Sequence, residues 1–394
     1  MPNKIICGDV LEVLKTLDSE SVQCVVTSPP YWGLRKYIED DAPEKKHELG
    51  LEKTPEEYVA KMVEVFREVR RVLREDGTLW LNLGDSYSGS NSTKDSVVNK
   101  NSLSARAGHT LGGVNKARGI VDGLKAKDLC GIPWRVAFAL QADGWWLRQD
   151  IIWNKPNPMP ESVTDRCTKS HEYIFLLTKA GKYFYDAEAV KEPISETYAN
   201  DKRPHRVLRQ RFYPDSKYVK NGMIEANASD FPKEHRDETR NKRSVWTITT
   251  QPYAEAHFAT FPEEIPLICI KAGTSEKGCC QKCGSTWERI IEKGNLIGKD
   301  RGGNYNGREI DSMVSKNYGT PGMAYENITT GWQPACTCDP GYPVPCTVLD
   351  PFSGAGTTCM VAKKLNRQYI GVELNPKYVE MSEKRIETEV GTLF

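Results

Sequence analysis

The chain has 394 residues, enough for two or three domains at about 100–200 residues each. Charged residues make up 27% and hydrophobic residues 39%, a composition that excludes a disordered or fibrous protein. With 54 basic and 53 acidic residues there is no global positive field, so any binding of nucleic acid must come from local patches. No apolar run approaches the ~18 residues of a membrane span, and the first residues lack a signal-peptide layout, so we expect a cytoplasmic protein.

The first part of the chain alternates predicted strands and helices. IICGDVLEVLKTL predicts a strand, a turn and an amphipathic helix, and SVQCVVTSPPYWGL predicts a buried strand that ends in a Pro-Pro loop. A helix follows from Thr54, its expected N-cap, with Pro55 at the first helical position and Gly77 just past its end. TLWLNLGD is a further predicted strand. This alternation indicates an α/β protein built on a parallel sheet.

Two segments interrupt the alternation. Residues 86–128, rich in Ser, Asn, Gly and Lys, predict a long mobile loop, which in a compact domain is more often functional than not. The pattern resumes with a helix at IPWRVAFALQADG and strands at WWLRQDIIWNKP and HEYIFLLTKA. Residues 187–250 then mix Lys and Arg with Tyr and Phe, and we interpret them as an inserted recognition segment. HFATFPEEIPLICIKA predicts a return to the fold as a helix.

A further predicted insertion, residues 279–346, carries paired cysteines. The pairs are Cys280 with Cys283 and Cys336 with Cys338. Four thiolates can close a tetrahedral structural zinc site, and in a reducing compartment twelve cysteines favour a metal over a disulfide framework. Cys279 or Cys346 could replace one ligand. The alternative is a set of free buried cysteines without metal.

Residues 348–373 contain a glycine loop between a strand and a helix. The strand ends at Asp350, the loop is PFSGAGTT, and a second strand ends at Glu373. Such glycines let the backbone approach a ligand closely, and an acid at the tip of the next strand can bridge two ribose hydroxyls. The pair fits a dinucleotide or S-adenosylmethionine. The third glycine of GxGxxG is missing, and Asp350 would repel a diphosphate while suiting a sulfonium, so S-adenosylmethionine is favoured.

The loop Ser28-Pro29-Pro30-Tyr31 follows the buried strand CVVT near the N-terminus. Pro29 restricts Ser28 to extended geometry and both prolines lack an N–H, so the loop is stiff. It offers a hydroxyl, a carbonyl and an aromatic ring side by side, which can hold a planar base that carries an exocyclic amine. Because the carboxyl ends of neighbouring parallel strands open on one crevice, this loop and the glycine loop can share a site.

Five sequence blocks in this order resemble DNA amino-methyltransferases of the permuted, β-type order: TSPPYWGLRKY, LNLGDSY, DIIWNKPNPMP, HFATFPEEIP and LDPFSGAGTT. The resemblance implies a circularly permuted, Rossmann-like S-adenosylmethionine-dependent methyltransferase fold. Residues 1–186 would be its catalytic half, 187–250 its target-recognition insertion and 251–394 its cofactor-binding half. The implied partners are double-stranded DNA and a cognate restriction endonuclease.

The resemblance also implies roles for single residues. Catalysis falls on the SPPY loop, that is on Ser28, Pro29, Pro30 and Tyr31. The cofactor pocket would be formed by Asp9, Asp350, Phe352, Gly354, Gly356, Thr357, Glu373, His257, Phe258, Thr260 and Pro262. The pocket for the target base would be lined by Trp32, Trp153 and Lys155.

The implied reaction is methyl transfer from S-adenosylmethionine to the exocyclic amine of a base flipped out of duplex DNA. Serine, rather than aspartate, at the first position of the SPPY motif resembles the N4-cytosine group, so cytosine is the predicted target and N6-adenine the alternative. Pro345-Cys346 lies just before the cofactor strand, where the nucleophile of carbon-5 cytosine methylation does not belong. Two other readings are a nicotinamide oxidoreductase and a non-catalytic zinc-containing DNA-binding protein. DNA contacts are expected from basic residues in 94–127, 202–211, 233–243 and 284–335.

Overall fold

The computed structural model describes residues 3–33, 38, 41–89, 121–193, 239–251, 261–297, 324–339 and 341–391. The chain divides into two compact units, one of residues 1–189, 243–287 and 334–394, and one of residues 190–242 and 288–333. Most of the basic segments expected to contact DNA lie outside the described residues, as do His257, Phe258 and Thr260. None of the helices in the described part of the chain has the length and apolar run that crossing a bilayer requires.

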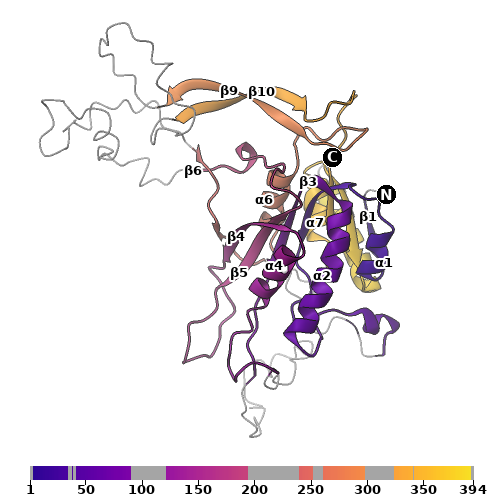
Figure 1. Ribbon diagram of the computed structural model, residues 1–394, viewed down its shortest axis with the longest axis vertical. Helices are drawn as coiled ribbons and strands as arrows, with labels where there is room; N and C mark the ends of the chain where they lie inside the picture. Colours follow the sequence, from indigo (N-terminus) through magenta and orange to yellow (C-terminus); the bar gives the residue numbers. More distant parts are fainter. Residues whose placement is uncertain are drawn as a thin grey trace, which may run out of the picture. The chain divides into compact units, whose positions relative to one another are not determined.

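An eight-stranded sheet forms the centre of the first unit (Figure 1). Its order is β1 (Lys4–Cys7), β12 (Gln368–Glu373), β11 (Thr347–Asp350), β2 (Val22–Thr27), β3 (Leu73–Leu83), β5 (His171–Thr178), β4 (Trp146–Asn154) and β8 (Val245–Thr247). The strands from β1 to β3 in this order are parallel, whereas β5 is antiparallel to both β3 and β4. The predicted α/β fold with a large parallel sheet is confirmed. The antiparallel direction of HEYIFLLT was not predicted.

The sheet order brings the two ends of the chain together. The strands β11 and β12, from the C-terminal part, lie between β1 and β2 of the N-terminal part. Chain order is therefore no obstacle to a site shared by the N-terminal and C-terminal loops, as the permuted motif order predicted.

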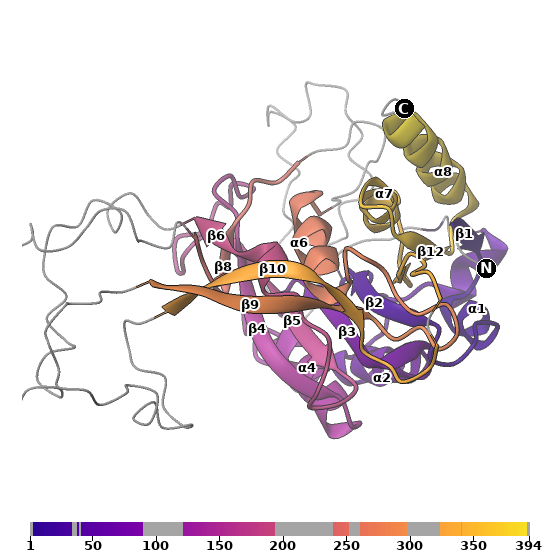
Figure 2. The same cartoon turned by 90° about the horizontal axis from the view of Figure 1, so that it is seen from above.

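Helices cover both faces of this sheet, as Figure 2 shows. One face carries α1 (Val10–Lys15), α2 (Pro55–Val72) and α4 (Ile132–Ala142), and the other carries α6 (Glu264–Gly273), α7 (Thr357–Lys364) and α8 (Pro376–Gly391). The short 3₁₀ turns are η1 (Pro43–His47) and η2 (Glu188–Val190). Helix α2 buries Tyr58, Met62, Phe66 and Val69 along one side. Burial of such a side chain contributes about 1.5–3 kcal/mol, so this face holds α2 on the sheet.

Helix α2 begins where the sequence predicts and ends earlier. The Thr54 hydroxyl accepts from the Glu57 N–H at 3.2 Å and the Glu57 carboxylate accepts from the Thr54 N–H, a capping box that confirms the predicted N-cap. The helix ends at Val72 rather than at Gly77, because β3 begins directly at Leu73 and Gly77 lies inside it. A Cβ at Gly77 would lie 2.5 Å from the Leu73 side chain, so the glycine permits the close approach within this irregular start of the strand.

The second unit contains two small sheets. Strands β9 (Trp287–Ile297) and β10 (Ala324–Pro334) pair with each other, and β6 (Glu192–Pro193) pairs with β7 (Thr239–Arg240). The Arg289 guanidinium lies 4.4 Å from the centre of the Trp332 ring, a cation–π contact between β9 and β10. Parts of both predicted insertions belong to this unit, whereas the paired cysteines belong to the first unit.

Candidate active site

The SPPY loop and the glycine loop leave the sheet at adjacent strand ends. Strands β2 and β11 pair in parallel, and β2 ends at Thr27 while β11 ends at Asp350. The Thr27 hydroxyl donates to Asp350 Oδ1 at 2.7 Å. In addition, the Thr358 hydroxyl donates to the Val26 carbonyl at 3.2 Å. The loops that follow these two strands therefore begin at one place, as the sequence predicts.

Asp350 is a buried acid that organises both loops. Its side chain is almost inaccessible to solvent, and Oδ1 also accepts the Phe352 N–H at 3.1 Å. Burial raises the pKa of Asp350 to about 6, although the hydrogen bonds from the Thr27 hydroxyl and the Phe352 N–H act in the opposite direction. The carboxylate thus shapes the turn into the glycine loop. A direct contact with a methionine group of the cofactor stays a prediction.

The two glycines of the loop have different surroundings. Gly354 has φ 50°, its N–H donates to Glu373 Oε2 at 2.9 Å, and a Cβ there would meet nothing within 4 Å. Gly356 has φ 74° and precedes α7, and a Cβ there would lie 2.7 Å from Ser382 Cβ on α8. Gly356 is therefore required for helix packing, whereas Gly354 borders open space where a ligand can approach. Thr357 is buried, and its hydroxyl accepts from Arg385 at 3.0 Å.

Two further predicted acids lie at the ends of neighbouring strands. Strands β1 and β12 pair in parallel with Cys7 opposite Glu373, and Asp9 follows β1. Glu373 also accepts the Asn375 N–H at 2.8 Å, and burial raises its pKa. Asp9 caps α1 through the Glu12 N–H, and its Oδ2 lies 3.3 Å from His47 Nδ1.

The structure brings together the acids Asp9 and Glu373 beside the glycine loop. His47 is a neighbour of this group that no sequence signal indicated. Pro262 is buried just before α6, and Phe352 packs on the core.

Ser28 and Tyr31 belong to a hydrogen-bond chain that leads into the sheet. The Ser28 hydroxyl donates to the Tyr31 oxygen at 3.2 Å. The Tyr31 hydroxyl lies 2.7 Å from Glu172 Oε2 and 3.0 Å from Asn82 Oδ1. The Asn82 amide donates to Glu172 Oε2 at 3.2 Å and to the Tyr173 carbonyl at 3.1 Å. Strands β3 and β5 thus supply the groups that fix the SPPY loop.

The backbone around the loop fits the Tyr31 ring closely. A Cβ on Gly84 would lie 2.6 Å from Tyr31 Cε2, so only glycine leaves room for the ring. The Tyr58 hydroxyl on α2 donates to the Pro30 carbonyl at 2.9 Å. Asn82 and Gly84 belong to the block LNLGDSY and Glu172 to HEYIFLLTK, but neither block predicts these contacts. The available signal was a polar residue within an apolar strand.

The predicted base-pocket residues are placed differently from one another. The Lys155 ammonium forms an ion pair with Glu172 Oε1 and lies 4.2 Å from the centre of the Trp153 ring. Trp153 is buried, and its Nε1–H donates to the Ile248 carbonyl at 2.8 Å. Lys155 is therefore linked to the SPPY loop through Glu172. Trp32, by contrast, is 1% exposed in the core under α2, with its Nε1–H bound to the Glu52 carbonyl, so we leave it out of the proposed pocket.

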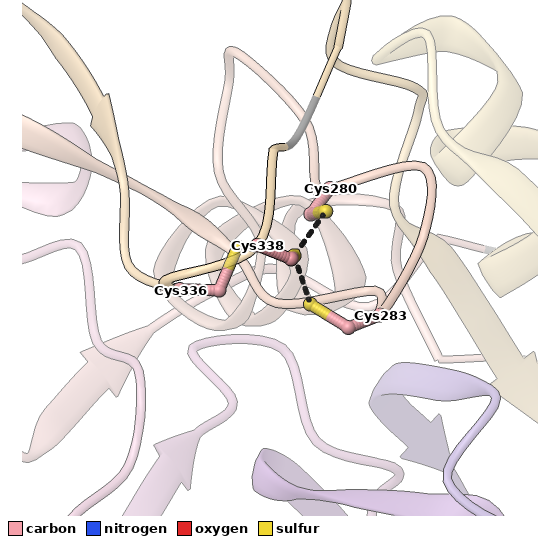
Figure 3. A group of neighbouring side chains, drawn as sticks. All are labelled: Cys280, Cys283, Cys336 and Cys338. Carbon is pink, nitrogen blue, oxygen red and sulfur yellow. Dashed lines mark hydrogen bonds between the residues drawn. The ribbon is translucent and has the colours of Figure 1, made fainter.

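The four paired cysteines converge from two segments, as Figure 3 shows. Their sulfur atoms all lie within 4.8 Å of one another, and Cys338 Sγ lies 3.1–3.5 Å from each of the other three. All twelve cysteines of the chain are free thiols. In the turn of residues 280–283, hereafter the knuckle, the backbone N–H groups of Cys283 and Lys282 lower the pKa of Cys280 to about 6, whereas hydrogen bonds to the three other thiols raise the pKa of Cys338.

The cysteine cluster is bound to the amino ends of the strands, whereas the candidate site lies at their carboxyl ends. Gln23, the second residue of β2, donates to the Gly284 carbonyl at 3.1 Å and accepts the Thr347 N–H at 2.7 Å. Arg74, near the start of β3, donates to the Cys283 carbonyl. The SPPY and glycine loops leave the carboxyl ends of β2 and β11, so the cysteines lie away from the candidate reaction centre.

The sheet order, the glycine loop and the adjacent SPPY loop define an α/β methyltransferase of the class that modifies exocyclic amines. The sequence matches the N6/N4 methyltransferase family, described as DNA methylase, over residues 22–280 and 346–384. The chain belongs to this family, and it is a DNA methyltransferase.

Curated relatives match nearly the whole chain. The Type II methyltransferase M.Cfr9I of Citrobacter freundii is 37% identical over 97% of this chain and 87% of its own length. The Type II methyltransferase M.SmaI of Serratia marcescens is 36% identical over 97% of this chain and 90% of its own length. A solved structure, the PvuII DNA methyltransferase (cytosine-N4-specific), is 16% identical over 100% of this chain and 92% of that chain, with a TM-score of 0.49.

Proposed function

We propose that this chain transfers the methyl group of S-adenosylmethionine to the N4 amine of a cytosine flipped out of duplex DNA. The observation that carries the proposal is the hydrogen bond between Thr27 and Asp350, which fixes the SPPY loop beside the glycine loop. A loop that binds the target base and a loop that binds the cofactor, both at the carboxyl ends of neighbouring strands, suit direct transfer of a methyl group between the two bound molecules. Membership of the DNA methylase family supports the same reaction class.

The residues at this edge fit S-adenosylmethionine. Gly354 borders open space, so the backbone there can lie against a ligand. Glu373 is a partly buried acid at the end of β12, suited to the ribose hydroxyls, and Asp9 follows the adjacent strand, where it could accept from an adenine amine. Asp350 and Phe352 would border the methionine part. When bound, the cofactor supplies an electrophilic methyl group on a sulfonium. Gly356 and Thr357 support the glycine loop, and roles for Pro262, His257, Phe258 and Thr260 stay predictions.

Ser28 and Pro29 would act on the target amine. A base inside a duplex is out of reach and must be flipped out, at a cost of a few kcal/mol. The amine lone pair is delocalised into the ring, and hydrogen bonds from its two N–H groups to Ser28 Oγ and to the Pro29 carbonyl would draw the nitrogen toward tetrahedral geometry. No described residue donates to the Pro29 carbonyl, whereas the Pro30 carbonyl is occupied by Tyr58. Positioning then supplies most of the acceleration, and no covalent enzyme intermediate is needed.

The choice of cytosine rests on the neutral Ser28 hydroxyl. Ring N3 of cytosine is only an acceptor, so a serine can sit beside the base without repelling it. Trp153 and Lys155 would form a wall of the pocket. N6-adenine is the alternative target, and the matched family includes both N4 and N6 enzymes.

We also propose a structural zinc ion on Cys280, Cys283, Cys336 and Cys338. A Zn–S bond of about 2.3 Å in a tetrahedron separates the sulfurs by about 3.8 Å, a value bracketed by the distances between these thiols. Four protein ligands leave no open position for catalysis. The ion would hold the knuckle against the starts of β2, β3 and β11 through Gln23 and Arg74.

Nucleoside mass spectrometry tests the reaction. Purified protein and S-adenosylmethionine are incubated with mixed-sequence duplex DNA, which is then digested and analysed. N4-methylcytosine supports the proposal, and N6-methyladenine retains the reaction but overturns the choice of base. Ser28→Ala is expected to abolish methyl transfer while S-adenosylmethionine binding stays intact. Full activity in that variant would show that the hydroxyl has no role. Contacts of the basic segments with DNA, and a cognate endonuclease, stay predictions.

A further inference from the structure

Glu172 is a partly buried acid at the SPPY loop that the proposed reaction does not yet use. It lies at the start of β5, and its side chain is about 15% exposed. Oε2 receives the Tyr31 hydroxyl and the Asn82 amide, and Oε1 receives the Lys155 ammonium. Glu172 therefore joins the SPPY loop to β3, which carries Asn82, and to the residue that follows β4, Lys155.

The chemistry of these groups fixes the direction of the hydrogen-bond chain. An ionised carboxylate can only accept, and the Tyr31 hydroxyl has one hydrogen to give. The Tyr31 oxygen lies closer to Glu172 Oε2, at 2.7 Å, than to Asn82 Oδ1, at 3.0 Å, so we assign the hydrogen to the bond with Glu172. The Tyr31 oxygen in turn accepts from the Ser28 hydroxyl at 3.2 Å.

The direction of this hydrogen-bond chain determines whether Ser28 can accept a hydrogen bond from the substrate. Because the hydrogen of Ser28 is engaged by Tyr31, the remaining lone pairs of Oγ can accept from a substrate amine. If the chain ran the other way, Tyr31 would occupy one lone pair of Ser28 Oγ, and the Ser28 hydrogen would no longer be held away from the amine hydrogens. The reaction needs an acceptor at this position.

We propose that Glu172 is a positioning residue that, through Tyr31, holds Ser28 as a hydrogen-bond acceptor toward the target amine. The proposal rests on the function proposed above. Lys155 balances the charge of Glu172 and occupies its second oxygen. Gly84, which has no side chain, leaves room for the Tyr31 ring to lie close to the end of β3. Glu172 itself does not touch the reacting atoms.

Three substitutions test this role by single-turnover methyl transfer at saturating DNA and cofactor. Glu172→Gln is isosteric, but its amide can donate to Tyr31 and reverse the chain, so the rate should fall about 100-fold, as for a misplaced reacting group. Glu172→Asp is smaller but can only accept, so it should retain more activity than Glu172→Gln. A role in packing alone predicts the opposite order, because glutamine conserves the volume. Dissociation constants for S-adenosylmethionine should not change.

The third substitution, Tyr31→Phe, breaks the same chain while keeping the ring against Gly84. Because both residues act through one path, the double variant Tyr31→Phe/Glu172→Gln should be no slower than the slower single variant. The control is Glu56→Gln, an exposed acid paired with Arg135, which removes the same charge and should leave the rate unchanged. Thermal unfolding of each variant checks that it folds.

The outcomes separate this inference from the proposed function. If wild-type protein methylates DNA but Glu172→Gln matches it, or if the two substitutions multiply in the double variant, the positioning role is wrong and the proposed function stands. If Glu172→Gln does not fold, the methyl-transfer rates of Glu172→Asp and Tyr31→Phe test the inference instead. Rates below wild type support it, and wild-type rates in both variants overturn it. Failure of the wild-type protein to methylate any DNA overturns the proposed function and this inference together.

Discussion

The Thr27 hydroxyl donates a hydrogen bond of 2.7 Å to Asp350 Oδ1, although 323 positions separate the two residues in the chain. Each residue is the last of its strand, and the strands β2 and β11 are neighbours in the sheet. One residue leads into the SPPY loop and the other into the glycine loop. This contact therefore sets the distance between the proposed methyl acceptor and the proposed methyl donor.

Thr27→Val removes this hydrogen bond with little change in shape. A hydrogen bond to a charged group contributes about 1.5–3 kcal/mol, so the free energy of unfolding should fall by about 2 kcal/mol. Methyl transfer should slow as well, since the loops lose their common anchor. Urea unfolding and single-turnover assays measure the two effects. A variant with unchanged rate would show that the loops keep their separation without the contact.

Asp350 predicts a distinct dependence of stability on pH. The pKa of Asp350 in the folded chain is about 6, above its ordinary value of 3.8, so between these values the folded chain binds the extra proton. Stability then falls as the pH rises through this window, by about 3 kcal/mol from this group. Asp350→Asn should remove that slope. Urea unfolding of both proteins from pH 4 to 8 measures it, and parallel curves would contradict the prediction.

The permuted motif order made the shared site predictable. A strand followed by a ligand loop can be recognised locally, and parallel pairing then requires such loops to lie at one edge, as β2 and β11 do. The cap at Thr54 was predictable for the same reason, because its partner Glu57 is only three residues away. The antiparallel direction of β5 was not, since an apolar strand buried on both faces has the same pattern in either direction.

The hydrogen-bond partners of the SPPY loop lay beyond sequence reasoning. Glu172 meets Tyr31 across 141 positions, and neither residue carries a local signal of the other. Trp32 illustrates the same limit, because the family resemblance implied a place for it in the base pocket. The turn of the loop instead directs its ring into the core beside α2, where the Glu52 carbonyl satisfies its N–H.

Gly354 and Gly356 offer a matched pair of alanine substitutions. Both have positive φ, so each alanine costs about 1 kcal/mol of backbone strain. Gly356→Ala adds a clash with Ser382, so its stability should fall by a further 1–3 kcal/mol or so. Gly354→Ala meets open space, so it should fold but bind S-adenosylmethionine more weakly. Thermal unfolding and cofactor titration compare the two, and wild-type affinity in Gly354→Ala would place the cofactor elsewhere.

The cysteine cluster predicts one zinc ion per chain, measured by elemental analysis of purified protein. Cys338→Ser should lose the metal, because Cys338 contacts all three other thiols. The expected effect is a lower unfolding temperature, since the knuckle that Gln23 and Arg74 bind at the starts of the strands would no longer be held together by a metal ion. Cys167→Ser, at an exposed free thiol outside the cluster, is the control and should retain zinc and stability. A wild-type protein that is folded and active without zinc would leave the four cysteines as ordinary thiols.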